Sequence, residues 1–236
     1  MTYVSSDLHG FSADDFWRLL DSAGFSDSDE LIVLGDVIDR NGDGGIALMR
    51  RMAMEPNISL LMGNHEAMLL SCSFLFDTIT EESISRLDDT RIQLLSAWLN
   101  NGAAPTIASL RALFHEDEES ARALVEYMED APVYEEVRLH GQRYVLTHAG
   151  LGNFSPDKPL DAYTAEELLW HRPAPEESYY PDATVILGHT PTQYYGKQHQ
   201  GRMLRTPTWL DIDTGAAGGG SPMLLRLEDE REFYFK

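Results

Sequence analysis

The sequence predicts an α/β fold, and three observations lead to this prediction. Short apolar runs typical of strands buried on both faces alternate with helical segments through about residue 70. Polar residues directly follow five of the apolar runs. The 236 residues suit one sizeable domain, with at most an insertion, rather than two full domains. We therefore expect a single domain over residues 1–236, in which the polar residues meet in one crevice beyond the carboxyl ends of the strands.

The expected strands are short apolar runs, and helical segments separate the first three of them, as in βαβ units. The helical segments are Phe11–Ala23 and Ile46–Met54. The strands are Tyr3–Val4, Leu31–Leu34, Ile58–Met62, Tyr144–Leu146, Val185–Leu187, Trp209–Asp213, Met223–Leu227 and Glu232–Phe235.

The segment at about 73–130 differs from the rest, because it has no strand-like run and its apolar residues follow helical spacing. We interpret it as a helical insertion, broken at residues 100–102 and at Pro105. Its apolar side chains are expected to pack rather than to bind a cofactor. One expected face consists of Ile84, Leu87, Leu94, Leu95 and Trp98, and another of Ala121, Leu124, Val125 and Met128.

The charge of the chain excludes some partners. With 18 basic and 39 acidic residues, the formal net charge is −21, which repels nucleic-acid backbones and anionic lipids. We expect neither a nucleic-acid nor a membrane partner, and no apolar run approaches the length of a membrane span. A phosphorylated ligand stays possible in this acidic protein, since bound divalent cations would reverse the charge locally.

Cysteine usage favours a reducing compartment. Cys72 is the only cysteine, so no internal disulfide can form, and we expect it to be a buried structural thiol. Met1 leads directly into a predicted strand without the segments of a signal peptide. The sequence therefore predicts a cytoplasmic protein.

The polar residues at the strand ends are of the types that bind divalent metals. Carboxylates, imidazoles and an amide oxygen suit Mn²⁺, Fe or Zn²⁺, and the scarcity of cysteine argues against a thiolate site. Two such ions about 3.5–4 Å apart can stabilise both the attacking and the leaving oxygen of a phosphoryl transfer, and a bridging carboxylate would hold them together. The motifs are Ser6–Gly10, Gly35–Arg40, Gly63–Glu66, His148–Gly150 and Gly188–Thr190.

In this order, the motifs resemble those of the calcineurin-like metallophosphoesterases, specifically the phosphoprotein phosphatase branch. The likeness is greatest to small bacterial and phage serine/threonine phosphatases and to their diadenosine-tetraphosphate hydrolase relatives. With Asp213-Thr214-Gly215 and the glycines that follow, it spans residues 6–220. The resemblance implies a β-sandwich of two mixed sheets flanked by helices, with a two-metal centre at one edge.

The resemblance also implies two divalent ions, Mn²⁺ being the first choice. The six implied ligands are Asp7 and His9 for the first ion, Asp36 as the bridge, and Asn64, His148 and His189 for the second ion.

Four further residues are implied to act on the substrate. His65 would protonate the leaving oxygen, and Asp39 would orient and charge it, which is the expected effect of a carboxylate beside an imidazole. A purely structural hydrogen bond is the alternative for this pair. Arg40 and Arg172 would bind phosphate oxygens through their guanidinium groups, although Arg172 also fits a surface arginine.

Two features in and directly after the first two motifs need a separate interpretation. Ser6 and Asn41 stand where the family usually has glycine, and we expect Asn41 to adopt the left-handed backbone that glycine adopts there. Residues 39–44 also match the opening of an EF-hand loop. Arg50 stands where the closing glutamate belongs and a strand precedes the loop, so we interpret residues 41–45 as a turn into the next helix.

Three functions remain open at this stage. The first choice is a serine/threonine protein phosphatase that acts by direct attack of a metal-activated hydroxide on phosphomonoesters. The second is a hydrolase of diadenosine tetraphosphate or other nucleotide polyphosphates, which the lack of an evident aromatic or basic clamp in the insertion disfavours. The third is a non-catalytic binding module of the same fold, which the complete ligand set disfavours.

Overall fold

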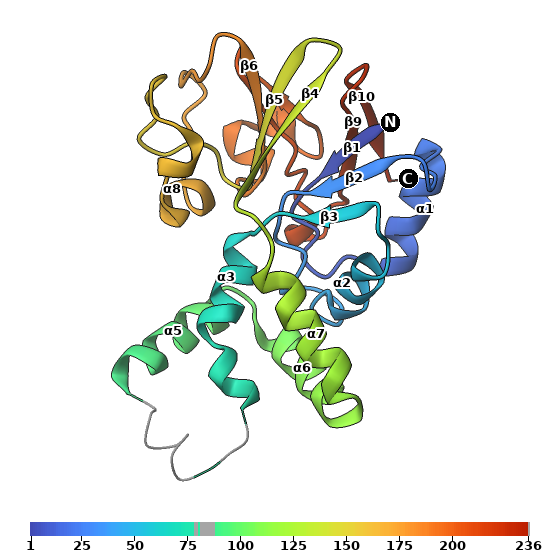
Figure 1. Ribbon diagram of the computed structural model, residues 1–236, viewed down its shortest axis with the longest axis vertical. Helices are drawn as coiled ribbons and strands as arrows, with labels where there is room; N and C mark the ends of the chain where they lie inside the picture. Colours follow the sequence, from blue (N-terminus) through green and yellow to red (C-terminus); the bar gives the residue numbers. More distant parts are fainter. Residues whose placement is uncertain (78–79, 81–87, 236) are drawn as a thin grey trace.

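The computed structural model describes residues 1–77, 80 and 88–235, and they form two five-stranded mixed sheets with helices on their outer faces. Figure 1 shows the two sheets side by side, with α1 and α2 next to the first sheet and α8 next to the second. This is the predicted β-sandwich.

The first sheet has the order β10-β9-β1-β2-β3. Its three N-terminal strands are parallel, whereas β9 and β10 are antiparallel to their neighbours. The strands are β1 (Thr2–Ser5), β2 (Glu30–Val33), β3 (Ile58–Leu60), β9 (Met223–Arg226) and β10 (Arg231–Tyr234).

The second sheet has the order β4-β5-β6-β8-β7, with a parallel centre formed by β5, β6 and β8. The edge strands β4 and β7 are antiparallel to their neighbours, so both sheets are mixed. The strands are β4 (Tyr134–Leu139), β5 (Gln142–Thr147), β6 (Ala183–Leu187), β7 (Leu204–Arg205) and β8 (Trp209–Asp211).

The predicted strands are apolar on both faces because both faces are covered. Along β2, Leu31 packs under the helices of the first sheet, whereas Ile32 packs between the sheets. Along β6, Ile186 shares that central core, and Val185 and Leu187 pack against the segment that contains α8. The sandwich thus has one central core and two outer ones.

Two helices connect the first three strands, as predicted. They are α1 (Ala13–Ala23) and α2 (Ile46–Ala53). In the turn before α2, the Asp43 carboxylate accepts hydrogen bonds from the backbone N–H groups of Gly45 and Ala47, at 3.0 and 2.8 Å. Asp43 thus satisfies free amide groups at the start of the helix.

The region of the predicted insertion contains three described α-helices after α3, which Figure 1 shows at one end of the molecule. The prediction that Pro105 breaks a helix is wrong, because it lies in the first turn of α6, where its missing N–H is not needed. The helices are α3 (Asn64–Ser71), α5 (Asp89–Asn100), α6 (Ala104–Glu116) and α7 (Glu118–Glu129).

The two expected apolar faces differ in burial. On α7, Ala121, Leu124 and Met128 are buried and Val125 is half-buried, as expected. On α5, Trp98 is buried and Leu95 is half-buried against the core, as expected, whereas Leu94 is exposed and the prediction is wrong at this position. Ile84 and Leu87, which belonged to the same prediction, lie outside the described residues.

The remaining elements are short. They are η1 (Ser73–Phe76), η2 (Leu160–Ala162), α8 (Ala165–Leu169), η3 (Thr192–Tyr195), η4 (Lys197–His199) and η5 (Ala216–Gly218). None of the helices in the described ranges is long and apolar enough to cross a membrane. Cys72 is a buried free thiol, as predicted.

Glu66 fixes the loop that follows β2. Its side chain is fully buried, and its carboxylate accepts hydrogen bonds from the backbone N–H groups of Asp36, Val37, Ile38 and Gly63 at 2.8–3.3 Å. One carboxylate therefore satisfies four amide groups and holds this loop against the start of α3.

Glu66→Ala should lower the free energy of unfolding by at least about 2 kcal/mol, because a buried amide that loses its acceptor costs about 1–3 kcal/mol. Urea unfolding measures this loss. Glu118→Ala is the matched control: Glu118 is exposed in an ion pair with Arg122, so its removal should cost less than about 1 kcal/mol. Equal losses in the two variants would contradict the role of Glu66.

Candidate metal centre and substrate cavity

The loops after β1 and β2 carry three of the predicted ligands in strained backbone. Asp7, His9 and Asp36 have φ values of 52°, 42° and 54°, a left-handed region that side chains rarely adopt. Hydrogen bonds between the two loops hold this conformation, from Asp7 N to Gly35 O at 3.1 Å and from His9 N to Asp36 O at 2.9 Å. Such strain persists where surrounding contacts enforce it, typically at functional sites.

The first group of side chains contains His9, Asp36 and Asp7. The Nε2 atom of His9 lies 3.5 Å from Asp36 Oδ2 and 3.8 Å from Asp7 Oδ1. His9 Nδ1 lies 3.1 Å from the carbonyl oxygen of Ile38, so this nitrogen carries the proton and Nε2 keeps its lone pair.

The second group contains Asn64, His148 and His189, which come from the start of α3 and from the loops after β5 and β6. His148 Nδ1 donates to Leu34 O at 2.7 Å, which leaves a lone pair on Nε2. That Nε2 lies 2.9 Å from Asn64 Oδ1 and 3.5 Å from Asp36 Oδ1. The donor atoms of Asp36, His148 and His189 all lie within 4.8 Å of one another.

The loop after β6 can reach the first group only because Gly188 has no side chain. A Cβ atom at this position would come within 2.1 Å of Asp7 Oδ2. The same carboxylate oxygen accepts a hydrogen bond from the backbone N–H of His189 at 2.8 Å. The two sheets therefore meet at the predicted ligands.

The donor atoms fit a pair of divalent cations. Asp7 Oδ1 and His189 Nε2 are buried without a hydrogen-bond partner among the described residues. The Nε2 lone pair of His148 faces oxygen acceptors rather than hydrogen-bond donors. Cations between these atoms would be bound by the lone pairs that otherwise repel one another. The mixed set of oxygen and imidazole donors suits Mn²⁺, Fe or Zn²⁺.

The pKa shifts agree with this fit. Burial, followed by the repulsion that a protonated His65 would exert, lowers the pKa of His9 to about 3, and burial also lowers the pKa of His189. Both imidazoles are therefore neutral at pH 7, as metal ligands must be. Burial and the nearby charges of Asp7 and Glu66 raise the pKa of Asp36 well above its ordinary value. Bound cations would offset this repulsion between carboxylates.

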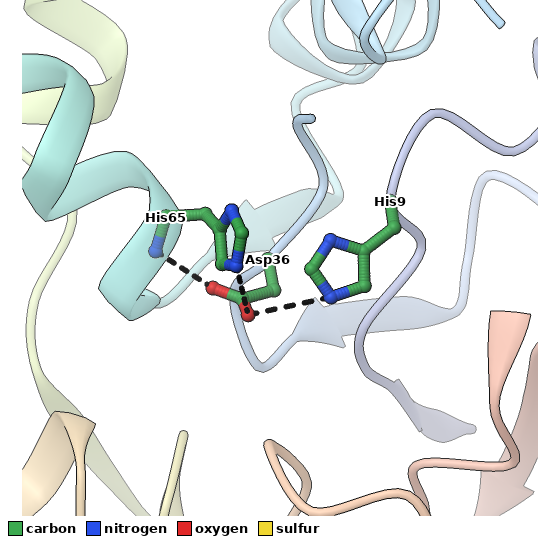
Figure 2. A group of neighbouring side chains, drawn as sticks. All are labelled: His9, Asp36 and His65. Atoms are coloured by element: carbon green, nitrogen blue, oxygen red, sulfur yellow. Dashed lines mark hydrogen bonds and ion pairs between the residues drawn. The ribbon is translucent and has the colours of Figure 1, made fainter. Parts of the chain in front are cut away.

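His65 lies beside the first group and contacts both expected partners. Figure 2 shows His65 and His9 on two sides of the Asp36 carboxylate, with His65 Nε2 at 3.8 Å from Asp36 Oδ2. His65 Nδ1 lies 2.6 Å from Asp39 Oδ2, and Nε2 lies 3.1 Å from Nη2 of Arg40. Since the guanidinium can only donate, Nε2 accepts and Nδ1 carries the proton.

The charge state of His65 differs from the simple expectation for a His–Asp pair. Burial and the positive charge of Arg40 lower the pKa of His65 to about 3, while burial raises the pKa of Asp39 to about 6. At pH 7, His65 is therefore neutral and Asp39 is largely ionised.

A cavity of about 430 Å³ opens over both groups. Arg172 is exposed at its wall, where Nη1 donates to Thr190 Oγ1 at 3.0 Å and to His189 O at 3.3 Å. The cavity volume suits a small-molecule ligand. Its lining residues are His9, Asp36, Arg40, Asn64, Asn101, Trp170, Arg172, His189, Thr190, Pro191, Tyr194 and Asp213.

Asn41 does not take the expected conformation. The residues of the described chain with positive φ include Asp39 and Arg40 but not Asn41. Its side chain instead donates to the carbonyl oxygens of His9 at 3.0 Å and Ala216 at 3.2 Å. The strain falls on the preceding residues, and the Asn41 amide joins the first loop to the segment after β8.

Several residues of the site were missed by the sequence analysis. Asp213 is buried and lines the cavity; it belongs to a quoted motif, but no role was assigned to it. Trp98 and Thr106 contact Asp39 from the region of the predicted insertion, where the helical pattern indicated only packing. Glu66 stands in the third motif, and its position three residues after Gly63 was a usable signal for a helix cap.

Curated relatives match parts of the chain. A symmetrical bis(5'-nucleosyl)-tetraphosphatase from Acidovorax sp. (strain JS42) is 38% identical over 73 residues, which are 30% of this chain and 26% of the relative. One from Paracidovorax citrulli (strain AAC00-1) is 27% identical over 170 residues, 72% of this chain and 48% of the relative. The matches thus span between about a quarter and a half of the length of these relatives.

Solved structures share the fold over nearly the whole chain. A candidate diadenosine tetraphosphatase has a TM-score of 0.67 at 17% identity, covering 99% of this chain and 91% of that one. A protein serine/threonine phosphatase from Saccharomyces cerevisiae has a TM-score of 0.56 at 14% identity, covering 100% of this chain and 79% of that one. At these identities the likeness establishes the fold alone.

The sequence model of the family described as calcineurin-like phosphoesterase matches residues 2–214, a range that includes every predicted ligand. The chain belongs to the calcineurin-like phosphoesterase family.

Proposed function

We propose that the cavity is the active site of a dimetal phosphoesterase that hydrolyses dinucleoside polyphosphates. The observation that carries the catalytic part is the convergence of imidazole lone pairs and carboxylate oxygens from both sheets on Asp36. In the proposal, Asp7 and His9 would hold one ion, and Asp36 would bind both ions. Three further residues would hold the second ion. These three are Asn64, His148 and His189.

The bound ions would supply Lewis-acid stabilisation of phosphate oxygens and a water of lowered pKa. Mn²⁺ is our first choice among the ions that fit, and Fe and Zn²⁺ share the same ligand preferences. The protein holds their ligands in place through the hydrogen bonds from His9 and His148 to backbone carbonyl oxygens.

His65 is proposed to be the general acid. Before substrate binds, Arg40 donates to His65 Nε2 and opposes protonation of the ring. A phosphate anion that takes the guanidinium of Arg40 removes this contact and adds negative charge nearby, both of which favour the protonated ring. Asp39, 2.6 Å from Nδ1, then stabilises the imidazolium that protonates the leaving oxygen.

Two observations favour a nucleotide substrate. Two curated relatives that match this chain are named symmetrical bis(5'-nucleosyl)-tetraphosphatases. In addition, the rim of the cavity carries two exposed aromatic side chains, Trp170 at 44% and Tyr194 at 75% exposure. Exposed aromatic rings beside a phosphate site suit nucleobases, because each base has a face for stacking.

This rim removes the main argument against a dinucleotide. The argument against a dinucleotide was that the insertion has no evident aromatic or basic clamp. The exposed rings lie outside the insertion, because Trp170 follows α8 and Tyr194 lies in η3. The Trp170 ring stands edge-on to His189, with centroids 6.0 Å apart, and Arg172 follows two residues later. Aromatic and cationic groups therefore both line the cavity.

Serine/threonine protein phosphatase, the first choice from sequence, becomes the second candidate. Arg40 and Arg172 both line the cavity that holds the predicted ligands. Such a pair can bind the dianionic terminal phosphoryl group of a phosphomonoester. The site therefore also fits a phosphoserine or phosphothreonine peptide.

The substrate proposal predicts that diadenosine tetraphosphate is hydrolysed with a higher kcat/KM than phosphoserine or phosphothreonine peptides. Symmetrical cleavage should yield two molecules of ADP, which chromatography detects directly. Metal ion and pH must be matched between substrates. A phosphopeptide that outperforms the dinucleotide would return the assignment to protein phosphatase.

Tyr194→Ala tests the stacking contribution within the same comparison. Stacking of a base on an aromatic ring contributes about 1–3 kcal/mol, so KM for the dinucleotide should rise at least about fivefold. KM for a small aryl phosphate should not change. An equal effect on both substrates would exclude a contact with the base.

The metal assignment predicts close to two divalent ions per chain, and removal of the ions should abolish hydrolysis until Mn²⁺ or a similar ion is returned. Elemental analysis measures the stoichiometry. Asp36→Asn should cause the greatest loss of activity among the ligand variants, since Asp36 is the ligand shared by both ions. Full activity of this variant with two ions bound, or of wild-type protein with one ion, would contradict the bridging role.

The acid assignment predicts that His65→Asn slows turnover by about 10²–10⁴-fold while metal content stays nearly intact. The loss should shrink for an aryl phosphate with an acidic phenol, because its leaving group needs little protonation. Since His65 Nε2 also lies near Asp36, loss of metal in this variant would identify His65 as a ligand instead.

A further inference from the structure

The Asp39 carboxylate is buried and makes hydrogen bonds to three side chains. Its Oδ2 atom lies 2.6 Å from His65 Nδ1 and accepts from the indole N–H of Trp98 at 2.7 Å. Its Oδ1 atom accepts from the hydroxyl of Thr106 at 2.5 Å. The same hydroxyl oxygen accepts from the backbone N–H of Asp39 at 3.0 Å, so Thr106 fixes the main chain and the side chain together.

Trp98 and Thr106 come from the predicted insertion, 59 and 67 residues away from Asp39 in sequence. Trp98 lies near the end of α5 and Thr106 in the first turn of α6. Both side chains are fully buried. Trp98 is also the only fully buried residue of α5, and its indole N–H is the group that donates to Asp39.

The turn between α5 and α6 also holds Arg40. The carbonyl oxygen of Gly102 accepts a hydrogen bond from the backbone N–H of Arg40 at 2.9 Å. Gly102 has a φ of +100°, and a Cβ atom there would come within 2.8 Å of Arg40 Cγ. The glycine therefore permits the close approach of the two segments. Together, α5, α6 and the turn between them contact both Asp39 and Arg40, the two residues that act on His65.

These contacts restrict the Asp39 carboxylate to one orientation. A carboxylate that bonded only to His65 could rotate about its side-chain torsions, but donors on both oxygens hold its plane. Buried polar networks that are fully satisfied are rigid in this way. The orientation matters because the hydrogen bond to Nδ1 determines where His65 Nε2 points.

We propose that Trp98 and Thr106 are positioning residues for the general acid, and that the insertion serves to hold Asp39 against His65. Neither side chain is among those that line the cavity. The proposal rests on the proposed function, because it assigns their effect to protonation of the leaving group.

Trp98→Phe and Thr106→Val test the proposal, since each removes the side-chain donor to Asp39. Val keeps the shape of Thr, whereas Phe is smaller than Trp, so the Trp variant needs a control with the same loss of volume. Each should lower kcat about tenfold or more for a poor leaving group, the range expected for a hydrogen bond to a charged group. KM and metal content should change little. In a series of aryl esters of the phosphate class that the wild type hydrolyses, the rate should depend more steeply on leaving-group acidity than in the wild type.

Two further variants separate positioning from stability. Thr106→Ser keeps the hydroxyl and should retain the wild-type leaving-group dependence. Trp209→Phe is a matched control, because Trp209 is also fully buried but donates to the backbone oxygen of Glu177 at 3.0 Å. It should destabilise the protein without changing the leaving-group dependence. If one of the two test variants does not fold, the other still decides the question.

A spectroscopic measurement tests the contact without any turnover. A proton between His65 Nδ1 and Asp39 should give a strongly downfield NMR resonance, which its loss in His65→Asn identifies. Thr106→Val and Trp98→Phe should shift or broaden it, whereas Trp209→Phe should not.

Folded variants with an unchanged resonance and unchanged leaving-group dependence would overturn the positioning role. So would a loss of rate that is equal for all leaving groups and is also seen in Trp209→Phe. The absence of metal-dependent hydrolysis in the wild type would instead contradict the proposed function, and the NMR result would still decide the contact.

Discussion

The Asp36 carboxylate is the group on which the rest of the site depends. Its Oδ1 atom accepts from the backbone N–H of His65, and its own backbone N–H donates to Glu66, so main chain and side chain are both fixed to α3. The left-handed backbone of Asp36 is strained, and these contacts offset the strain. Three imidazole Nε2 atoms lie 3.5–3.8 Å from its oxygens, those of His9, His65 and His148.

Much of this arrangement could be predicted from sequence because its signals are local. Asp7 and Asp36 each follow a strand, and parallel strands bring their carboxyl ends to one edge of a sheet. His148 and His189 follow two parallel strands of the other sheet in the same way. The motifs alone do not show that the two sheets face each other. This expectation came from the family resemblance.

What the sequence did not predict depends on contacts between distant segments. Trp98 was placed correctly on an apolar face, but periodicity carries no information about where an indole N–H points. The neutral state of His65 was not predicted for a similar reason. The carboxylate of Asp39 was visible in the sequence, but the burial and the Arg40 contact that lower the pKa of His65 were not. Tyr194 was missed because exposure on a cavity rim leaves no pattern in the chain.

The proposed ligand set is divided between the two sheets, and this division would couple metal binding to folding. Asp7, His9, Asp36 and Asn64 follow strands of the first sheet, whereas His148 and His189 follow β5 and β6 of the second. Apolar residues join the sheets along the central core, but at this edge the contacts are between acidic and imidazole groups.

Burial and the nearby charges of Asp7 and Glu66 raise the pKa of Asp36 at this edge. The raised pKa reflects the free-energy cost of burying several carboxylates close together. An ion that binds only the folded chain stabilises it by mass action, by about 2.7 kcal/mol at a concentration one hundred times its dissociation constant. Bound cations would therefore offset the electrostatic cost of the buried carboxylates. Without them, the stability gained by burying apolar residues in the core must offset this cost. The carboxylates that suit the site for phosphoester chemistry would thus also make the contact between the two sheets at this edge depend on bound cations.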